Sequence, residues 1–279
     1  MSNVIGSVSS LLRRKIRSIG HGLGSLPRHP YEEQFSSELD FPRVAWAKQF
    51  YMIASTPRCG SHLLGHMLAQ TNLFGMPLEY LNRRNLKHWQ RRFGASSVQE
   101  AFELLVQHRT SENGVFCVKA HWKQFEPWAN AVTDLTRGLG FQRIVWIVRR
   151  DQLLQAISYS IAMQTGAWIS GSEASARAEY RYEEIVQYAR KLSDMNLAWK
   201  SYLSKEYPDS HIRVIYEDLL LDDTIQGLLA TSLKLSNTLR KPKRTQVQGG
   251  RRNEQWAEQF KNDLRPQDAW VLEEATWFD

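Results

Sequence analysis

Cysteine is scarce in this chain: only Cys59 and Cys117 occur among its 279 residues. They lie far apart, and neither belongs to a Cys-x-x-Cys pair or to the Cys/His spacing that holds zinc. A disulfide-stapled scaffold and a cysteine zinc site are therefore excluded. Reduced cysteines beside apolar segments behave as small apolar residues, so we expect a reducing, cytoplasmic compartment.

Long apolar runs are also missing. No run approaches the roughly 18 residues that a membrane-spanning helix needs, and the N-terminus lacks the apolar stretch of a signal peptide. We expect residues 1–42 to form a basic, flexible segment and residues 43–279 to form one globular domain. Basic and apolar residues mix over residues 1–27, which favours a poorly ordered tail and leaves open a peripheral contact at the inner membrane face.

The chain carries a formal charge of +7, yet it has no extended block of lysine and arginine interleaved with aromatic residues. A positive balance favours anionic partners such as phosphates, sulfates or an acidic membrane surface. Because the basic block is missing, nucleic acid is not an expected partner.

Short apolar runs alternate with longer helical patterns along the chain. The predicted strands are Phe50–Ala54, Val115–Val118, Ile144–Val148 and Ile212–Tyr216. The predicted helices are Ser61–Gln70, Val98–Gln107, Leu153–Met163 and Glu183–Leu203. This alternation predicts an α/β, P-loop-like, three-layer fold, in which helices flank a central, mostly parallel sheet. Ligands of such sheets bind beyond the carboxyl ends of the strands.

The turn after the first predicted strand lacks the lysine that a Walker A loop carries after its second glycine, which disfavours a loop that hydrolyses ATP or GTP. A strand, a tight turn and a helix start still point backbone N–H groups at one spot, and Arg58 adds a positive charge. An ordinary turn with Ser61 as the helix N-cap is the alternative. The candidate anion-binding residues are Ser55, Thr56, Arg58, Cys59, Gly60, Ser61 and His62.

A second candidate anion site follows the third predicted strand. Arg149 ends that strand, and Ser158 lies nine residues further on, about two turns into the next helix. An arginine at a strand end and a serine on the following helix can hold one phosphate together. The alternative is an arginine that is solvated or paired with Asp151.

Three early segments match motifs of one known group of enzymes. Arg58-Cys59-Gly60-Ser61 is similar to an Arg-Ser-Gly-Ser loop, and Gly75-Met76-Pro77-Leu78-Glu79-Tyr80 to a Gly-x-Pro-x-Glu-aromatic segment. Val118-Lys119-Ala120-His121-Trp122 is similar to a Gly-Lys-x-x-Trp segment. Later matches are Arg149, Asp151, Gln155, Ala156 and Ser158, then Gln164, Thr165 and Trp168, then Ala178-Glu179-Tyr180, and finally Gln248 and Trp256.

Taken in order, these segments resemble the sulfotransferases that use 3′-phosphoadenosine-5′-phosphosulfate (PAPS), most closely the bacterial Stf0-type family of trehalose 2-sulfotransferase. The resemblance spans roughly residues 48–264. It implies in-line transfer of the sulfuryl group of PAPS to a hydroxyl of a carbohydrate or glycolipid, with PAP as product and no metal. A homodimer stays open.

The resemblance also assigns roles in donor binding. Arg58, the loop N–H groups and Lys119 are expected at the 5′-phosphosulfate. The residues expected at the 3′-phosphate are Arg149, Ser158, Arg251 and Arg252.

Two residues compete for the role of general base. The trehalose-type resemblance implies Glu79, whose pKa we expect burial beside an anionic donor to raise. His121 is the alternative, because Lys119-Ala120-His121 resembles the Lys-x-His segment of the cytosolic sulfotransferases, and imidazole titrates near neutral pH. The residues expected to bind the acceptor are Glu79, Tyr80, Trp122, Gln164 and Trp168.

Four positions depart from the family pattern. His62 stands where the loop usually has threonine, Cys59 replaces serine, Met76 replaces a charged residue, and Val247 replaces an arginine. Donor binding remains the expectation, while the acceptor is less well defined. Two other functions stay open: a non-catalytic nucleotide-binding relative and a P-loop-like kinase of small molecules.

Overall fold

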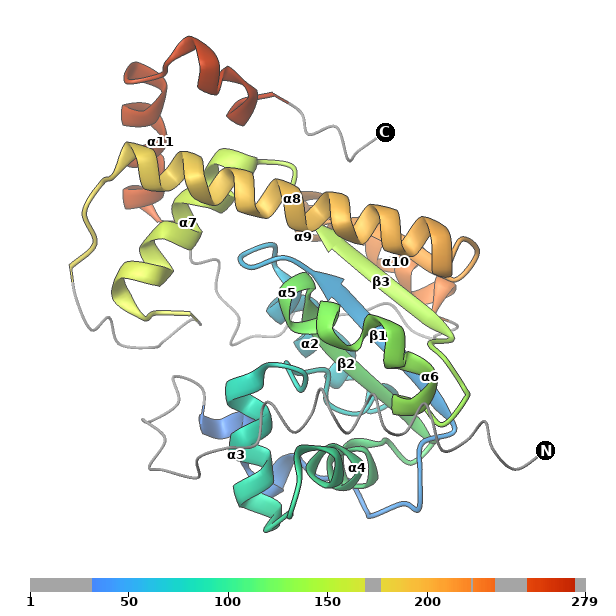
Figure 1. Cartoon of the computed structure of the whole chain (residues 1–279). Helices are drawn as coiled ribbons and strands as arrows, with labels where there is room; N and C mark the ends of the chain where they lie inside the picture. Colours follow the sequence, from blue (N-terminus) through green and yellow to red (C-terminus); the bar gives the residue numbers. More distant parts are fainter. Residues whose placement is uncertain (1–31, 169–176, 222, 234–249, 274–279) are drawn as a thin grey trace.

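The computed structural model describes residues 32–168, 177–221, 223–233 and 250–273. Its centre is a sheet of four parallel strands in the order β2-β1-β3-β4 (Figure 1). The strands are β1 Gln49–Ser55, β2 Val115–His121, β3 Arg143–Val148 and β4 His211–Ile215. All four coincide with predicted strands, apart from Tyr216, which begins a helix instead.

Helices connect the strands and cover the sheet. Four of them agree with the predictions: α2 Ser61–Ala69, α4 Val98–Arg109, α7 Gln152–Thr165 and α8 Tyr182–Glu206. The sequence patterns did not reveal α3 Arg83–Phe93, α5 Trp122–Phe125, α6 Val132–Leu135, α9 Tyr216–Leu221, α10 Asp223–Ser232 or α11 Arg251–Asn262. Short 3-10 turns are η1 Glu32–Phe35, η2 Ser37–Leu39, η3 Glu126–Ala131 and η4 Pro266–Val271.

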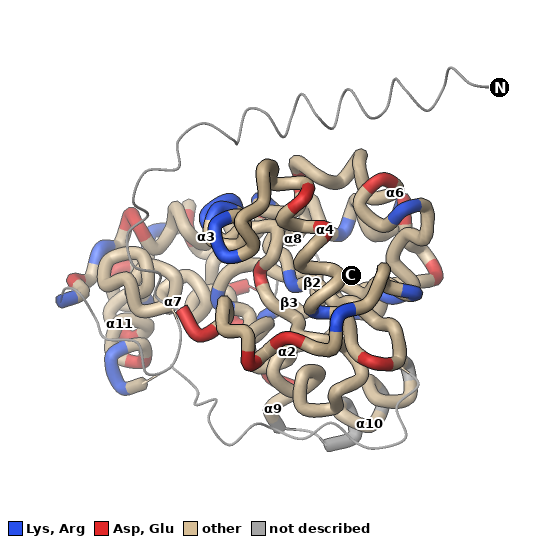
Figure 2. The backbone as a smooth tube through the Cα atoms, turned by 90° about the horizontal axis from the view of Figure 1, so that it is seen from below, with Lys and Arg blue, Asp and Glu red and all other residues tan. Residues whose placement is uncertain are grey.

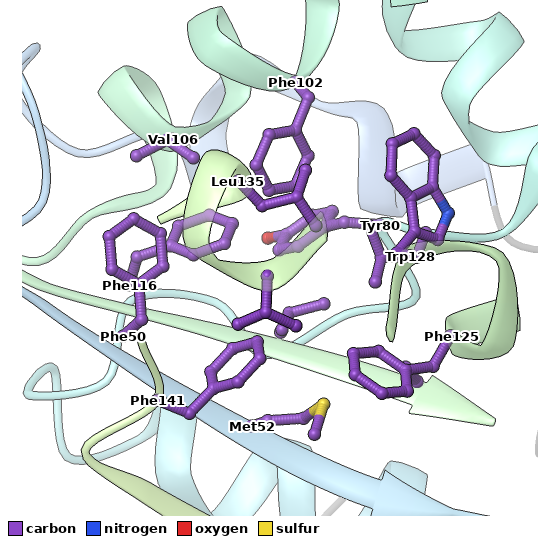
Figure 3. Close-up of a cluster of buried hydrophobic side chains, with 14 of the residues drawn as sticks. Phe50, Met52, Tyr80, Phe102, Val106, Phe116, Phe125, Trp128, Leu135 and Phe141 are labelled. Carbon is purple, nitrogen blue, oxygen red and sulfur yellow. The ribbon is translucent and has the colours of Figure 1, made fainter. Parts of the chain in front are cut away.

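Successive strand residues point to opposite faces of the sheet, and each face has its own core. Phe50, Met52 and Ala54 join a cluster with side chains of α3, α4, α5, α6 and α8 (Figure 3). Ile53 joins a second cluster with side chains of α2, α9 and α10. The sheet therefore lies between two helical layers, which confirms the predicted three-layer α/β fold.

A third apolar cluster joins α7, α8 and α11. These helices lie together on the side toward which the strand arrows point (Figure 1). Leu153 and Ile157 of α7 pack there with Trp256 and Phe260 of α11. The cluster holds α7 beside the carboxyl edge of the sheet, where ligands of such folds bind.

The predicted flexible segment, residues 1–42, needs a correction for its last part. Phe35 stacks on His88 with ring centroids 4.9 Å apart. Asp40 pairs with Arg92 and with the buried Arg109, whose Nε lies 2.9 Å from Oδ1. Residues 32–42 therefore belong to the domain, because these contacts fix them against α3 and α4. Residues 1–31 lie outside the described ranges.

Both cysteines are free and buried. Cys59 lies in the turn before α2, and Cys117 lies in β2. Among the helices in the described ranges, none is both long and apolar enough to cross a membrane.

Candidate active site

The turn between β1 and α2 has an unusual backbone. Arg58 has φ of 64° and Gly60 has φ of 85°, and residues other than glycine seldom adopt such values. A Cβ at Gly60 would lie 2.0 Å from a ring carbon of Tyr216, so the position requires glycine. Gly60 is the N-cap of α2 and makes no side-chain capping bond. The positive end of α2 is therefore left for another acceptor, such as an anion.

Two side chains from distant helices hold this turn in place. Gln155 of α7 donates from Nε2 to Thr56 Oγ1 at 3.0 Å and to the carbonyl of Pro57 at 2.7 Å. Trp199 of α8 donates from Nε1 to the carbonyl of Ser55 at 2.8 Å. In the sequence, Gln155 belongs to a family motif that indicates no role for it. Its role here is to join the turn to α7.

The two predicted anion sites are adjacent. Arg58 Nε donates to Ser158 Oγ at 2.9 Å, and its Nη1 donates to the carbonyl of Trp168. Arg149 Nη1 lies 3.4 Å from the carbonyl of Arg58. Burial, and then the charge of Arg149, lower the pKa of Arg58 to about 10. Two guanidinium groups thus share one small region, and the charge on Arg58 is disfavoured there until an anion enters.

Arg149 is only partly satisfied within the protein. Its buried Nε has no hydrogen-bond partner within the described ranges, and the closest carboxylate, Glu217 Oε1, lies 3.6 Å away. Its guanidinium stands over the ring of Tyr216, 5.5 Å from the centroid. A phosphate group bound here would supply the missing acceptor oxygens, so the residues present fit such a group.

Glu217, which no sequence motif indicated, organises the start of α7. Its carboxylate accepts from the backbone N–H groups of Arg150 and Asp151 at 2.9 and 3.2 Å. Asp151 caps α7 by accepting from Leu154 N at 2.7 Å, and no ion pair between Asp151 and Arg149 occurs in the described part of the chain. The only signal in the sequence was its position, because Glu217 is an acidic residue that follows the fourth predicted strand.

The second half of the site consists of Glu79, Lys119, His121 and Gln124, and we call it the acceptor side after its predicted role. A segment alongside β2 builds it. Leu78 pairs with Val118, and Lys119 N donates to the carbonyl of Leu78 at 2.9 Å. This pairing places Glu79 against the end of β2. There Lys119 Nζ lies 2.8 Å from Glu79 Oε1, and His121 Nε2 lies 3.5 Å from the same oxygen.

A second fixed donor completes the surroundings of Glu79. Gln124 of α5 donates from Nε2 to Glu79 Oε2 at 2.8 Å, while its Oε1 accepts from the backbone N–H of His121 at 3.1 Å. Gln124 was not predicted as a site residue. Its position, three residues after the N-cap His121, is that of a capping box, which the spacing could have revealed.

The expected raised pKa of Glu79 is wrong. Burial alone would raise this pKa, but the charges of Lys119 and His121 and their hydrogen bonds outweigh it and hold the pKa well below its ordinary range. Glu79 is therefore a fixed carboxylate at neutral pH. Its charge is matched inside the protein by Lys119.

The side chains of three loop residues, Ser55, Cys59 and His62, do not have the properties that the predicted role in donor binding requires. Ser55 Oγ donates to the carbonyl of Ala120 at 3.1 Å and lies 2.9 Å from His121 Nδ1, so its hydroxyl is already engaged. The Cys59 side chain is fully buried, so only its backbone can meet a ligand. Burial, and then the charge of Lys119, lower the pKa of His62 to about 2, so His62 is neutral.

A sequence model of the Stf0 sulphotransferases matches residues 50–263. The chain belongs to this family. It is thus a transferase of the sulfotransferase class, as the ordered motifs predicted. The match covers both anion-binding elements and the Glu79 segment.

Several solved sulfotransferases are similar in structure at low identity. The sulfotransferase domain from the curacin biosynthetic pathway is 16% identical, covering 80% of this chain and 93% of that one, with a TM-score of 0.46. The domain from the Synechococcus PCC 7002 olefin synthase is 16% identical, covering 83% and 95%, with a TM-score of 0.47. The sulfotransferase from Alicyclobacillus acidocaldarius is 14% identical, covering 84% and 100%, with a TM-score of 0.47. No curated protein matches the chain.

Two predicted acceptor-binding residues of this Stf0 sulfotransferase have other roles. Tyr80 is completely buried, donates to the carbonyl of Met76, and stacks on Phe116 with ring centroids 5.5 Å apart (Figure 3). Its prediction as a substrate contact is wrong, because its ring belongs to the core. The Gln164 amide is hydrogen bonded to Glu179 N and O at 2.8 and 3.0 Å, and also to Ser160 and Glu184. It therefore joins α7 to the chain before α8.

The two predicted tryptophans are also partly used in packing. Trp122 packs edge-on against Trp199 of α8, with centroids 5.0 Å apart. The Trp168 ring lies 5.9 Å from that of Tyr159. Both side chains are only partly buried, so contact with an acceptor stays a prediction.

Arg251 and Arg252 begin α11 and are exposed. Within the described ranges, no contact joins either of them to Arg58, Arg149 or Ser158. Gln248 and Val247 lie outside the described ranges. The role of these arginines at the 3′-phosphate therefore stays a prediction.

The helix next to Glu79 is strongly basic. Helix α3 begins four residues after Glu79, contains no acidic residue, and shows a band of lysine and arginine (Figure 2). Arg83 and Arg91 are exposed and Lys87 is partly exposed, while Leu86 and Trp89 face the core. The acceptor side thus continues into a positively charged surface. In the described part of the chain, no group of three or more metal-ligating side chains occurs.

Proposed function

We propose that this sulfotransferase moves the sulfuryl group of PAPS to a hydroxyl of a carbohydrate or glycolipid and releases PAP. The observation that carries this proposal is the 2.9 Å contact between Arg58 and Ser158. It brings the turn after β1 next to the middle of α7. A nucleotide with phosphate groups at both its 5′ and 3′ positions needs two such anion sites side by side.

The donor roles follow from the charges. The open N-terminus of α2 and Arg58 are suited to the 5′-phosphosulfate, and Arg149 with Ser158 to the 3′-phosphate. The Nε of Arg149 supports this assignment, because it lacks a hydrogen-bond partner among the described residues and a buried donor without a hydrogen bond is costly. In the reaction, negative charge grows on the leaving phosphate oxygen, and fixed positive groups lower the barrier by stabilising it.

The acceptor proposal rests on the positive surface beside Glu79. A hydroxyl that reaches Glu79 and His121 passes near α3, whose exposed side carries Arg83, Lys87 and Arg91. Each basic residue close to an anionic membrane contributes about 1 kcal/mol to binding. A glycolipid acceptor at the cytoplasmic face of a membrane fits this surface.

The function is tested by incubating the purified protein with PAPS labelled in its sulfuryl group and a panel of sugars and lipid extracts. We expect labelled product that forms in the presence of EDTA and is inhibited by PAP. Labelled product with ATP labelled in its γ-phosphate, and none with PAPS, would instead indicate a kinase. Stabilisation by PAP without product across the panel would indicate a non-catalytic binding protein.

The membrane part of the proposal has its own test. We expect the full chain to sediment with vesicles containing one-third phosphatidylserine and not with pure phosphatidylcholine vesicles. The R83E/K87E/R91E variant should lose this binding. A matched variant of three exposed residues elsewhere, R190E/K191E/K205E, should keep it. Equal loss in both variants would assign binding to net charge alone.

A further inference from the structure

The segment of residues 32–42 lies along one side of α3, and we call it the strap. Its side chains Gln34, Phe35 and Asp40 make the contacts. The residues of α3 that they contact are Asn85, His88, Trp89 and Arg92. Residues three, four and seven positions apart share one side of a helix, so these four form a single stripe. The exposed basic residues of α3 lie on its other side.

A buried arginine of α4 fixes the strap. Arg109 is completely buried, and its Nη2 donates to the carbonyls of Gln34 and Ser36 at 3.0 and 2.9 Å. Its Nε lies 2.9 Å from Asp40 Oδ1. A buried guanidinium needs a carboxylate and acceptor oxygens around it, and the strap supplies both. The strap is therefore a firm support for whatever it contacts on α3.

Asn85 joins the strap to the acceptor side. Its Nδ2 donates to the carbonyl of Glu79 at 2.9 Å and to Gln34 Oε1 at 3.3 Å. Both partners only accept here, so both amide hydrogens are used and the reversed amide would face two acceptors. Its buried Oδ1 has no hydrogen-bond partner in the described ranges, which costs stability. The benefit of Asn85 thus lies in the two bonds that it donates.

These bonds hold the backbone of Glu79 on the side away from β2. Before Glu79, Leu78 is paired with β2, because Lys119 N donates to its carbonyl at 2.9 Å. After Glu79, the chain turns into α3, and the Glu79 carbonyl accepts from Asn82 N at 3.3 Å as well as from Asn85. The Glu79 carboxylate therefore reaches Lys119 from a backbone that is held at both ends.

We infer that Asn85 is a positioning residue, which holds Glu79 between the strap and β2 and so fixes the geometry of the acceptor side. The effect on turnover rests on the proposed function, whereas the effect on the pair of Glu79 with Lys119 does not. A small shift of this backbone lengthens the 2.8 Å contact between the two charges and weakens their attraction. The donor turn belongs to β1 and α2, so the inference leaves PAP binding unaffected.

The first test is a double-mutant cycle in the full chain, measured by urea unfolding without any donor or acceptor. Asn85→Leu removes the donated bonds, keeps a similar volume and has the higher helix propensity. We expect Lys119→Met to change the unfolding equilibrium constant at least about threefold less in Asn85→Leu than in the wild-type background. Equal effects of Lys119→Met in both backgrounds would overturn the inference.

A second variant covers the case in which Asn85→Leu does not fold. Asn85→Asp keeps the shape of the side chain, and a carboxylate in the first turn of a helix is favourable, but an ionised aspartate cannot donate. Its cycle with Lys119→Met at pH 7 should show the same loss of coupling. Full coupling in Asn85→Asp would contradict the positioning role.

The second test measures turnover with labelled PAPS and the acceptor found in the panel above. For Asn85→Leu, we expect turnover to fall about tenfold to hundredfold while the dissociation constant of PAP changes less than about twofold. Unchanged turnover, or a loss of PAP binding as large as the loss of turnover, would overturn the inference. If the wild-type protein forms no sulfated product, the proposed function fails and the unfolding cycle alone decides the role of Asn85.

The matched control loosens the strap without touching Glu79. Phe35 stacks on His88 with centroids 4.9 Å apart and meets Trp89 edge-on at 5.1 Å. Phe35→Leu should lower stability, but the effect of Lys119→Met in that background and the turnover should match those of the wild-type protein. The same loss of coupling in Phe35→Leu as in Asn85→Leu would show general loosening of α3 and contradict a specific role for Asn85.

Discussion

The donor side and the acceptor side of the site differ in how their charges are balanced. On the donor side, Arg58 and Arg149 lie close together, and the Arg149 Nε has no hydrogen-bond partner in the described residues. On the acceptor side, Lys119 faces Glu79 at 2.8 Å, and Gln124 supports the second carboxylate oxygen. One half is arranged to receive an anion, while the other is complete without a ligand.

The pKa shifts express the same difference. The pKa of Arg58 is lowered to about 10, mainly by burial and then by Arg149, so its charge is disfavoured where it stands. The pKa of Glu79 is also lowered, because Lys119 and His121 outweigh the effect of burial, so its charge is favoured. A lowered pKa thus marks a cation whose charge is disfavoured on one side and an anion whose charge is favoured on the other. We expect mutations on the two sides to affect different properties.

The largest effect that we expect is the loss of turnover caused by Arg58→Met. Removing one positive group that stabilises the leaving phosphate should lower kcat about 10²–10³-fold. The free energy of unfolding should change by less than about 1 kcal/mol, since the lost hydrogen bonds are offset by relief of repulsion with Arg149. Kinetics with labelled PAPS and urea unfolding measure both. Arg190→Met, which removes an exposed arginine of α8, is the control and should alter neither.

Mutations on the acceptor side should mainly lower the free energy of unfolding. Lys119→Met leaves the Glu79 carboxylate without its main partner, and we expect the free energy of unfolding at pH 7 to fall by about 3 kcal/mol. This is the lower end of the range for a broken buried pair, because 25% of the Glu79 side chain is exposed. The control is Lys123→Met, which breaks the surface pair between Lys123 and Glu126, where the lysine side chain is 69% exposed. It should change the free energy of unfolding by no more than about 0.5 kcal/mol. A larger loss in the control than in Lys119→Met would remove the distinction.

Gly60→Ala tests the backbone that joins the two sides. Alanine here adopts a left-handed conformation and meets the Tyr216 ring, so the combined strain and overpacking should cost at least about 2 kcal/mol. PAP binding should weaken as well. Gly94→Ala is a matched control, because Gly94 also has positive φ (61°) but open space around it. Thermal unfolding with and without PAP should show a smaller loss of stability for Gly94→Ala, because only the conformational strain of the positive φ contributes there.

The smallest effect concerns acid stability. Because the pKa of Glu79 in the folded protein lies below its ordinary value of 4.5, the ionised carboxylate stabilises the fold above that value. This contribution is lost as pH falls from 4.5 through the folded pKa. Glu79→Gln should therefore be less stable than wild type at pH 7, and the difference should shrink below pH 4.5. Thermal unfolding between pH 7 and pH 3 checks this. A difference that grows toward low pH would contradict the ion pair.

Much of the fold was predictable because it depends on local patterns. The strands β1, β2 and β3 are largely buried, so each reads as a mainly apolar run, while β4 was recognised by its isoleucines and valine although Arg213 is exposed. The helices α2, α4, α7 and α8 show helical periodicity. Helix α3 was missed because most of its residues are polar or charged and its apolar residues are few. Asn82 at its N-cap and Gly94 at its C-cap were the available signals. The predicted contact between Tyr80 and the acceptor was wrong for another reason: the position of a residue in a motif does not say which way its ring points.

The candidate site was only partly predictable. The motifs identified Arg58, Lys119, Arg149 and Ser158, and strand topology correctly placed them at one edge of the sheet. They did not reveal that Gln155 holds the turn after β1 or that Gln124 holds Glu79, because glutamine carries no charge pattern. Nor did they reveal the low pKa of Glu79, which depends on a lysine forty residues away in the chain.

By itself, the sequence determined the parallel α/β scaffold, the order of its strands along the chain, and which residue types follow each strand, since these depend on local periodicity and turn chemistry. The tertiary structure alone decided which of those residues meet. It joined Arg58 to Ser158, matched Glu79 with Lys119, and turned Ser55 toward His121. Electrostatic and hydrogen-bond energies depend on distances of a few ångströms between groups far apart in the chain, and such distances exist only after the layers have packed.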